Sequence, residues 1–497
     1  MKLKLICKAM GIACPRGREE DEVASIVTDS RKASEGSLFV CIRGLHSNGH
    51  RFILDAVHRG AKWIVAEQDT LIGCTPDICY LFVENTRRAS AFLFDAWYGS
   101  PTSSISVIGV TGTNGKTTVS TMLSRILTDQ GYRCGLIGTI GCSVDGEAIG
   151  DPDGAMTTPD PENLYRILSK MKERGVTHVV MEASSHALAL DKLAPIRFSV
   201  GIFTNLTPEH LDFHATMEEY AASKCRLAVQ SDRMIVNTDS PYAEQMCSVA
   251  GKVLRCSSQN SRADAYASEL ILSASGVSYR LRYEGEEREV ICQIPAAFTV
   301  MNSMQALLAA KAVGADMARA CLTLSRMNGV RGRMEMLDVG SELGFSVIID
   351  YAHTPDALEC ILQSVRLIRP QGRLILLFGC GGDRDRQKRP IMGRIASKAS
   401  DFIVLTSDNS RTERSEDIIR EILSGVEFRA PCTVILSRAE AISFAVSIAE
   451  RGDVLLLAGK GHEEYEIDCN GKRPFSERAI VLDACQKRLS DTKNRER

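Results

Sequence analysis

Residues 106–127, SVIGVTGTNGKTTVSTMLSRIL, hold the pattern with the clearest chemical meaning in this chain. A β-branched apolar run leads through Gly112 and Gly115 to Lys116 and Thr117, where a helical pattern begins. Because glycine has no side chain, backbone N–H groups can converge on an anion there, and the helix adds the positive end of its dipole. The lysine would neutralise the outer phosphates, and the threonine hydroxyl would bind Mg²⁺. The segment therefore predicts a phosphate-binding loop.

The spacing of this loop differs from the common G-x-x-x-x-G-K-[ST] pattern. Val110 occupies the place of the first glycine, and Gly109 stands one residue too early. The alternative interpretation is a glycine-rich turn between a strand and a helix that binds nothing. The Lys-Thr-Thr sequence, with an apolar run before it and a helical pattern after it, favours the phosphate site.

Three further residues are candidates for work beside a phosphate. Magnesium that bridges phosphates takes one or two carboxylates plus water, and Glu182 directly follows the apolar run THVVM. His210, in TNLTPEHLDFH, also follows an apolar run, but a lone histidine is more often structural. Lys224, in MEEYAASKCRL, would ordinarily be a solvated helix lysine. The residues alone make Glu182 the metal candidate and leave the roles of the other two open.

The elements that must position these residues alternate between strand and helix. The helix expected at 116–130 has one apolar face and ends at Gly131. Short apolar runs, such as FSVGIFTNL, FSVIIDYAH and RLILLFGCGG, are typical of mostly parallel sheets covered on both faces. In such sheets ligands bind beyond the carboxyl ends of the strands. We therefore predict an α/β protein of three domains, at residues 1–102, 103–331 and 332–497.

The bulk composition excludes several classes of protein. The 497 residues carry 60 Lys and Arg against 62 Asp and Glu, so nothing indicates nucleic acid or anionic lipid as a partner. The 17 cysteines form no CxxC pair and are expected to be reduced thiols. Lys8 interrupts the apolar stretch that a signal peptide would need, and no apolar run approaches the roughly 20 residues that span a bilayer. We expect a soluble, cytoplasmic protein without membrane insertion.

Ordered motifs along nearly the whole chain resemble those of the Mur ligases, the ATP-dependent amino-acid-adding enzymes of peptidoglycan synthesis. The resemblance is strongest to members that add a diamino acid to UDP-N-acetylmuramoyl-L-alanyl-D-glutamate (UDP-MurNAc-L-Ala-D-Glu). Such a series is far more specific than a single phosphate loop. The motifs are DSRKASEGSLFVCIRG, GVTGTNGKTT, MTTPD, EASSHAL, NLTPEHLDFH, YAASK, GRME, DYAHTPDAL, GCGGDRD, DNSR and AGKGHE.

The resemblance implies a UDP-binding first domain, a central P-loop ATPase domain and a Rossmann-like C-terminal domain. It implies catalytic roles for Lys116, Lys224 and His210. Lys224 matches a lysine that the family carbamylates with CO₂, which turns a cation into an oxygen anion suited to a hard metal. The implied Mg²⁺ ligands are Thr117, Glu182, His210 and Lys224 as its carbamate. The implied ATP-binding residues are Gly112, Thr113, Asn114, Gly115, Lys116, Thr117, Thr118, Asn302, Arg333 and Asp350.

The same resemblance implies where the UDP-sugar peptide binds. Its uridine end would contact Ser30 and the segment 45–47, and its sugar and peptide would contact the central domain. The implied residues are Ser30, Leu45, His46, Ser47, Thr157, Thr158, Ser184 and Lys192. The family usually has Gln and Arg where this chain has Leu190 and Lys192, so a hydrogen-bonding group and a bidentate fork are lost. Ala296 and Thr299 also depart, from a usual Gly and Asn.

The third-domain segment DNSR bears on which amino acid is added. In the family, D-N-P-R accompanies meso-2,6-diaminopimelate, whose second carboxylate the arginine binds, and Ser410 here replaces the proline. Arginine for a carboxylate and glutamate for an ammonium group is a sensible pairing. The implied amino-acid-binding residues are Arg384, Asp408, Asn409, Ser410, Arg411, Gly459 and Glu463. The presence of Arg411 favours meso-diaminopimelate as the added amino acid. Since Arg411 could instead be a solvated loop residue, L-lysine and L-ornithine stay open.

The reaction implied is ligation through an acyl phosphate formed from ATP on the D-glutamate carboxylate. Two other functions remain possible from the sequence. Folylpolyglutamate synthetase shares the phosphate loop, but DSRKASEGSLFV and DNSR argue against it. A nucleotide-switched P-loop binding protein would not need the third domain, and no N-K-x-D motif occurs. We expect a monomer.

Overall fold

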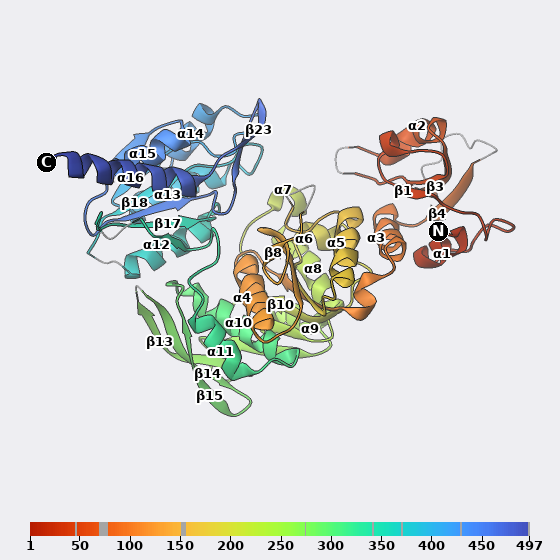
Figure 1. Cartoon of the computed structure of the whole chain (residues 1–497), viewed down its shortest axis with the longest axis horizontal. Helices are drawn as coiled ribbons and strands as arrows, with labels where there is room; N and C mark the ends of the chain where they lie inside the picture. The colour runs from red at the N-terminus through yellow and green to blue at the C-terminus, as the bar shows by residue number, and fades with distance from the viewer. Residues whose placement is uncertain are drawn as a thin grey trace.

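The computed structural model shows three α/β bodies that follow one another along the chain (Figure 1). Each body is built on its own sheet, and helices lie on both faces of every sheet. The described residues are 1–44, 47–68, 78–150, 156–273, 275–339, 342–368, 371–427 and 430–495.

The N-terminal body is a parallel sheet in the order β1-β2-β3-β4. Alternate side chains of its strands enter two apolar clusters, because successive residues of a strand point to opposite faces. α1 and α3 cover one face, and α2 covers the other. The elements are α1 (Leu3–Met10), β1 (Ser25–Val27), η1 (Ser30–Lys32), β2 (Ser37–Val40), η2 (Gly49–Phe52), α2 (Ile53–His58), β3 (Ala61–Glu67), β4 (Cys79–Val83) and α3 (Thr86–Trp97).

The central body follows η4 (Pro101–Ser104) and has an 11-stranded sheet in the order β15-β14-β13-β12-β11-β10-β5-β9-β6-β7-β8. Its strands are β5 (Ser106–Thr111), β6 (Cys134–Gly138), β7 (Gly141–Val144), β8 (Glu147–Ala148), β9 (His178–Glu182), β10 (Phe198–Phe203), β11 (Met234–Asn237), β12 (Val253–Ser257), β13 (Ala265–Ser273), β14 (Gly276–Tyr283) and β15 (Glu286–Cys292). Its helices are α4 (Lys116–Asp129), α5 (Pro161–Glu173), α6 (Ser185–Ala189), α7 (Leu211–His214), α8 (Met217–Val229), α9 (Ala243–Val249), α10 (Phe298–Ala312) and α11 (Met317–Ser325).

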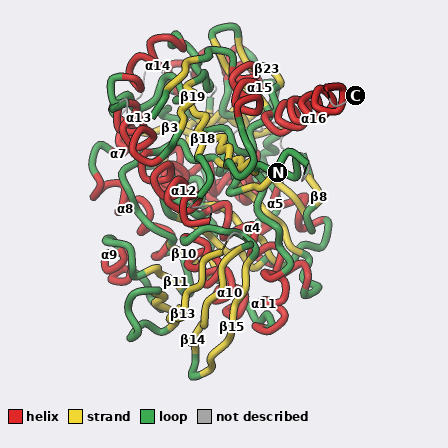
Figure 2. Tube along the Cα trace, turned by 90° about the vertical axis from the view of Figure 1, so that its left-hand side faces the viewer, coloured by secondary structure: helices red, strands yellow, loops and turns green. Residues whose placement is uncertain are grey.

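The central strands of this sheet, in the order β13-β12-β11-β10-β5-β9-β6, pair in parallel, so the carboxyl ends of β5, β9 and β10 meet at one edge. α4 and α10 pack on one face, whereas α5 and α8 pack on the other. Antiparallel strands extend both ends, and β13, β14 and β15 form the long meander at the bottom of Figure 2. The edge beyond β5, β9 and β10 is where parallel sheets bind ligands.

The C-terminal body has a sheet in the order β16-β17-β21-β18-β19-β20, parallel except for β16. α12, α13 and α14 lie on one face, and α15 and α16 lie on the other. Its strands are β16 (Glu335–Leu337), β17 (Ser346–Asp350), β18 (Leu374–Phe378), β19 (Phe402–Leu405), β20 (Cys432–Val434), β21 (Val454–Ala458), β22 (Tyr465–Asp468) and β23 (Gly471–Pro474). Its helices are α12 (Pro355–Ile368), α13 (Lys388–Ala399), α14 (Ser415–Leu423), α15 (Arg438–Ile448) and α16 (Glu477–Arg495).

The α/β architecture with largely parallel sheets is confirmed. The helix predicted at 116–130 is α4, which ends at Asp129, and Gly131 follows it with φ +90°. The antiparallel strands were not predicted, because strand pairing depends on partners that local periodicity does not reveal. The boundaries after residues 102 and 331 stay a proposal. No helix in the described part of the chain combines the length and apolar character needed to cross a membrane.

Candidate active site

The loop between β5 and α4 has a backbone that only glycine can adopt at two positions. Gly112 has φ +149°, and a Cβ there would lie 1.9 Å from Thr204 Oγ1. Gly115 has φ +87°, and a Cβ there would lie 2.6 Å from the Asn302 Oδ1 atom. Thr204 Oγ1 in turn donates a hydrogen bond to the carbonyl of Asn114 at 2.6 Å. The loop is therefore held in one conformation by its contact with the end of β10.

Gly109 has a different role, which explains the altered glycine spacing. It lies inside β5, and a Cβ there would lie 2.7 Å from Leu227 Cδ1 and 2.8 Å from Phe198 Cδ1. This glycine therefore lets β5 pack against its neighbours and does not face the phosphate loop.

Two lysines share one carbonyl of the phosphate loop. Lys116 Nζ donates to the carbonyl oxygens of Gly112 at 2.9 Å and Thr113 at 2.7 Å. Lys224 Nζ donates to the same Gly112 oxygen at 2.8 Å and lies 4.5 Å from the centre of the Tyr220 ring. Burial lowers the pKa of both amines, and the Lys116 cation lowers that of Lys224 further. Two amines on one carbonyl make this a strongly electropositive point.

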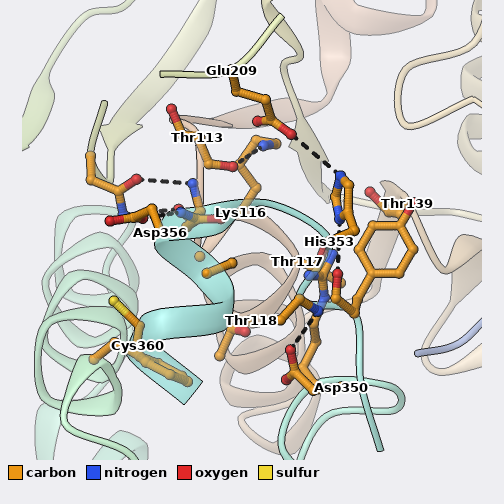
Figure 3. Close-up of a pocket in the computed structure, with 18 of the residues that line it drawn as sticks. Thr113, Lys116, Thr117, Thr118, Thr139, Glu209, Asp350, His353, Asp356 and Cys360 are labelled. Atoms are coloured by element: carbon orange, nitrogen blue, oxygen red, sulfur yellow. Dashed lines mark hydrogen bonds and ion pairs between the residues drawn. The ribbon is translucent and has the colours of Figure 1, made fainter. Parts of the chain in front are cut away.

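A cavity of about 260 Å³ lies over the phosphate loop, between the central and C-terminal bodies (Figure 3). Arg333 enters it from the connection between the two bodies: its Nη2 donates to Thr117 Oγ1 at 3.2 Å, and its guanidinium lies 4.5 Å from the Tyr351 ring centre. Arg333 Nε is buried and has no hydrogen-bond partner in the described part of the chain. A guanidinium held this loosely beside a phosphate loop is well placed to bind an anion.

Asp350 lies at the carboxyl end of β17 and lines the same cavity. Its Oδ2 accepts from the Met334 amide and its Oδ1 from the Ala352 amide, both at 2.7 Å. Burial raises the pKa of Asp350, although Arg333 acts in the opposite direction. All the predicted ATP-binding residues line this cavity except Gly112, whose carbonyl the two lysines share.

Glu182, the last residue of β9, and His210, the N-cap residue of α7, line the cavity as well. Glu182 Oε1 and Oε2 accept from the amide and hydroxyl of Thr139, both at 2.9 Å, which fixes the carboxylate. Burial lowers the pKa of His210 to about 4, so its imidazole is neutral, as metal ligation requires. No cluster of three or more His, Cys, Asp or Glu within the described ranges could hold a metal ion. A site with Glu182, His210 and the Thr117 hydroxyl fits a hard cation that keeps much of its water, as Mg²⁺ does.

Contacts that sequence reasoning missed join the central body to the C-terminal one. Glu209 Oε1 lies 3.4 Å from His353 Nε2, and Figure 3 shows the two side chains facing each other. Asn114 Nδ2 and Thr207 Oγ1 both donate to Asp356 Oδ2, at 2.8 Å and 3.3 Å. Burial acts to raise the pKa of Glu209, but the hydrogen bond to His353 and the nearby cations lower it overall. The signal lay in two of the family motifs: NLTPEH contains Thr207 and Glu209, and DYAHTPDAL contains His353 and Asp356. These four residues received no role from the sequence alone.

A buried polar cluster lies in the C-terminal body, beside the cavity. Asn409 Nδ2 donates to Glu463 Oε2 at 2.8 Å. Tyr351, which lines the cavity over the phosphate loop, donates from its hydroxyl to Glu463 Oε1 at 3.5 Å. Lys460 is fully buried and donates to Asn409 Oδ1 at 3.0 Å, with the carboxylates of Asp408 and Glu463 each 3.6 Å away. Sequence reasoning missed Lys460, although it belongs to the motif AGKGHE.

The other predicted amino-acid-binding residues surround this cluster. Arg411 has φ +52°, and its Nη1 donates to the carbonyls of Gly382 at 2.8 Å and Asn409 at 3.2 Å. Ser410 is buried, and a Cβ on Gly459 would lie 2.8 Å from an Asp408 carboxylate oxygen. Arg384 is exposed and donates to the Asp383 carbonyl at 3.1 Å. The left-handed conformation and the two carbonyl contacts show that Arg411 is held in place and is not a freely solvated side chain.

The residues predicted for the UDP-sugar peptide are spread over two bodies. The Ser184 amide donates to Thr158 Oγ1 at 3.1 Å, and Thr157 lines the cavity over the phosphate loop. Ser30 is buried in the N-terminal body, and Ser47 is exposed there. Leu45 and His46 lie outside the described residues.

Two of the departures noted in the sequence have clear positions. Lys192 Nζ lies 2.7 Å from Asp160 Oδ1, and Leu190 and Lys192 both line a second cleft, of about 650 Å³, between the N-terminal and central bodies. Thr299 is fully buried, and its hydroxyl has no hydrogen-bond partner among the described residues. Asn302, one turn later in α10, lines the cavity over the phosphate loop.

Comparisons with known proteins agree with this arrangement. Residues 22–87 match the family described as "Mur ligase family, catalytic domain", residues 110–310 match "Mur ligase middle domain", and residues 332–461 match "Mur ligase, glutamate ligase domain". A relative from Clostridioides difficile (strain 630), named UDP-N-acetylmuramoyl-L-alanyl-D-glutamate--2,6-diaminopimelate ligase, is 39% identical over 493 residues, which cover 98% of this chain and 100% of the relative.

Two solved structures extend the comparison. One bears the same ligase name, is 28% identical, has a TM-score of 0.69 and covers 97% of this chain and 99% of its own. The other is Mycobacterium tuberculosis folylpolyglutamate synthase complexed with ADP and AMPPCP, at 15% identity and a TM-score of 0.62, covering 81% of this chain and 95% of its own. At that identity the second likeness shows a shared fold alone.

Proposed function

This chain belongs to the Mur ligase family, and on that premise we propose that it joins a diamino acid to the D-glutamate carboxylate of UDP-MurNAc-L-Ala-D-Glu at the expense of ATP. The favoured amino acid is meso-2,6-diaminopimelate. The enzyme acts in the cytoplasm, as a monomer, in the synthesis of peptidoglycan precursors.

One observation carries the proposal: the phosphate-loop cavity adjoins a largely buried carboxylate, that of Glu463, suited to an amine. Tyr351 lines the cavity, and its hydroxyl is 3.5 Å from Glu463. A nucleotide on the loop and an ammonium group at Glu463 would therefore be close neighbours. Ligation needs this juxtaposition, because the activated acid must meet the amine before water does.

The chemistry follows from the poor reactivity of a carboxylate. An oxygen of the D-glutamate carboxylate attacks the γ-phosphorus of ATP, ADP leaves, and an acyl phosphate forms. The amine then attacks the acyl carbon, and the tetrahedral intermediate expels inorganic phosphate, which keeps the oxygen from the acid. Lys116, Arg333 and the loop N–H groups would stabilise the negative charge that spreads over the transferred phosphoryl group.

The residues present fit a magnesium ion in the nucleotide cavity. Thr117, Glu182 and His210 would hold it together with the carbamate of Lys224, and the bound ion would supply charge neutralisation for the phosphates. Carbamylation of Lys224 would replace one of the two amines on the Gly112 carbonyl with an anion, which would relieve their repulsion.

Two observations favour meso-diaminopimelate over L-lysine and L-ornithine. Within the described ranges Arg411 donates through Nη1 alone, so the rest of its guanidinium is available for a second carboxylate. The relative from Clostridioides difficile and the solved structure at 28% identity both carry 2,6-diaminopimelate in their names. Ser410, in place of the family proline, leaves the backbone at Arg411 in its left-handed conformation.

The alternative functions lack support of this kind. Folylpolyglutamate synthetase shares the fold at 15% identity, but the N-terminal match at residues 22–87 is to a Mur ligase domain. The nucleotide-switched binding protein was a wrong alternative, because the chain belongs to a family of ligases.

The proposal is tested by phosphate release with ATP, UDP-MurNAc-L-Ala-D-Glu and each of the three diamino acids in turn. We expect release to require both substrates and to be fastest with meso-diaminopimelate. Substrate labelled with ¹⁸O in the D-glutamate carboxylate should pass one label to the phosphate. Unlabelled phosphate, or turnover without either substrate, would refute the acyl-phosphate mechanism.

A further inference from the structure

The second cleft, between the N-terminal and central bodies, carries an excess of positive charge. We call it the N-terminal cleft. Four cationic side chains and two carboxylates line it, which leaves an excess of two positive charges. Thr28 and Leu190 are among the uncharged residues that line it. The charged residues are Lys32, Arg87, Arg166, Lys192, Asp160 and Glu162.

Arg87 is the charged residue that the fold itself does not explain. It is half-buried and makes no hydrogen bond or ion pair within the part of the chain that the structure describes. Arg87 is the second residue of α3, where a positive charge opposes the helix dipole. The first turn of α3 contains no acidic residue that could offset this charge. Burial lowers the pKa of Arg87, although the charges of Asp160 and Glu67 act in the opposite direction.

Two of the other three cations of the cleft, Lys192 and Arg166, are held at least in part, whereas Lys32 is exposed to solvent. Lys192 forms its ion pair with Asp160 at 2.7 Å. Arg166 Nη2 donates to Asn163 Oδ1 at 2.6 Å, which leaves its other nitrogens available. Among the described residues, the half-buried guanidinium of Arg87 has no hydrogen-bond or ion-pair partner, and Arg166 lines the same cleft with spare donors. Such an arrangement is costly unless an anion binds both.

The position of Arg87 indicates which anion. α3 packs against α5 of the central body, and Figure 1 shows the two helices side by side between the N-terminal and central sheets. Thr28 and Lys32 of the cleft flank Ser30, the predicted uridine contact. Lys192, on the opposite wall, is predicted to contact the sugar and peptide. The group between uridine and sugar in a UDP-sugar is the diphosphate, with roughly one negative charge on each phosphate.

We propose that Arg87 binds the diphosphate of the UDP-linked substrate across the N-terminal cleft, with Arg166 as a second contact. This inference rests on the proposed function and assigns the diphosphate to named side chains. Arg87 acts in substrate binding, far along the substrate from the phosphoryl transfer. Its loss therefore raises the KM for the UDP-linked substrate and leaves kcat, and the KM for ATP, largely unchanged.

The test compares Arg87→Met with Arg88→Met. Arg88 is the adjacent exposed arginine of α3, does not line the cleft and pairs with Asp191 at 3.5 Å. We expect Arg87→Met to raise the KM for UDP-MurNAc-L-Ala-D-Glu roughly 10- to 100-fold, as for a lost charge-assisted contact, and Arg88→Met to change it by less than about 2-fold. Equal effects of the two variants would overturn the proposal.

Stability provides a second readout that separates binding from a structural role. Arg87 has no hydrogen-bond or ion-pair partner among the described residues, and the attraction of Asp160 and Glu67 only partly offsets the cost of its burial. Ligand-free Arg87→Met should therefore unfold at the same temperature as the wild-type protein or higher. A lower melting temperature would assign Arg87 to the fold and refute its role in binding.

Calorimetry with UDP and with uridine identifies the group that Arg87 contacts. Arg87→Met should weaken UDP binding roughly 10-fold or more and leave uridine binding unchanged. If UDP binding were unaffected while the KM for the full substrate rose, Arg87 would serve the sugar–peptide end and the assignment would be wrong. If the wild-type protein bound UDP through Arg87 but ligated nothing, the proposed function would fail and this inference would stand.

Discussion

Replacing Lys460 by Met removes the cation at the centre of the buried cluster in the C-terminal body. The lysine is fully buried, donates to Asn409 Oδ1 and to the Tyr465 carbonyl, and lies 3.6 Å from the carboxylates of both Asp408 and Glu463. Methionine fills a similar volume but leaves the carboxylates without this counter-charge.

The expected size of the effect follows from these contacts. At 3.6 Å and an effective dielectric constant of about 20, each carboxylate attracts the ammonium group by roughly 5 kcal/mol, most of which repays the cost of burying the charges. Removing one partner of such a cluster costs about 3–5 kcal/mol of unfolding free energy. Arg438 remains beside Asp408, so the lower part of that range is expected. The KM for the diamino acid should also rise, because Glu463 loses a neighbour that fixes it.

Urea unfolding followed by circular dichroism measures the stability, and hydrogen exchange in β21 locates the loss in the C-terminal body. Lys472→Met is the matched control, because Lys472 is exposed and only covers the Tyr465 ring at 3.9 Å. It should cost no more than about 1 kcal/mol. Adding Glu463→Gln to Lys460→Met should recover part of the lost stability, since one uncompensated carboxylate disappears. A loss below about 1 kcal/mol for Lys460→Met, or a double variant less stable than either single one, would refute this reasoning.

Three further outcomes are expected. Lys116→Ala should abolish ligation while the melting temperature stays within a few degrees, because Lys116 serves the nucleotide; unfolding of the variant would make the lysine structural. Arg411→Ala should weaken use of meso-diaminopimelate by roughly 10-fold or more and leave L-lysine unaffected, so an equal loss for both amino acids would contradict recognition of the second carboxylate. The hydrogen bond from Arg389 lowers the pKa of Glu413 from 4.5 to about 2, so its contribution to stability is complete above pH 4.5 and disappears as the pH falls towards 2. Urea midpoints of wild type and Glu413→Gln should therefore differ at pH 7 and converge near pH 2, and a constant difference would show that the carboxylate charge is not responsible.

Much of the fold could be predicted from short-range pattern. The apolar face of α4 is encoded within one helix, and Gly131 follows its end. The strands β9, β10, β17 and β18 form where the apolar runs lie. The phosphate loop was recognisable because Gly112, Gly115 and Lys116 fall within a stretch of five residues. The antiparallel meander of β13, β14 and β15 was not, because its register depends on what lies across it.

The sequence by itself determined the class of fold, the phosphate loop and, through ordered motifs, the family. Each rests on residues that are neighbours in the chain, where periodicity and spacing act directly. Only the tertiary structure decided that Lys224 shares the Gly112 carbonyl across 112 positions, and that Asn114 reaches Asp356 across 242. It alone revealed the buried centre at Lys460 and the unpaired Arg87. Whether a charge has a partner depends on distance in space and on exclusion of water, and neither quantity is written in the local order of residues.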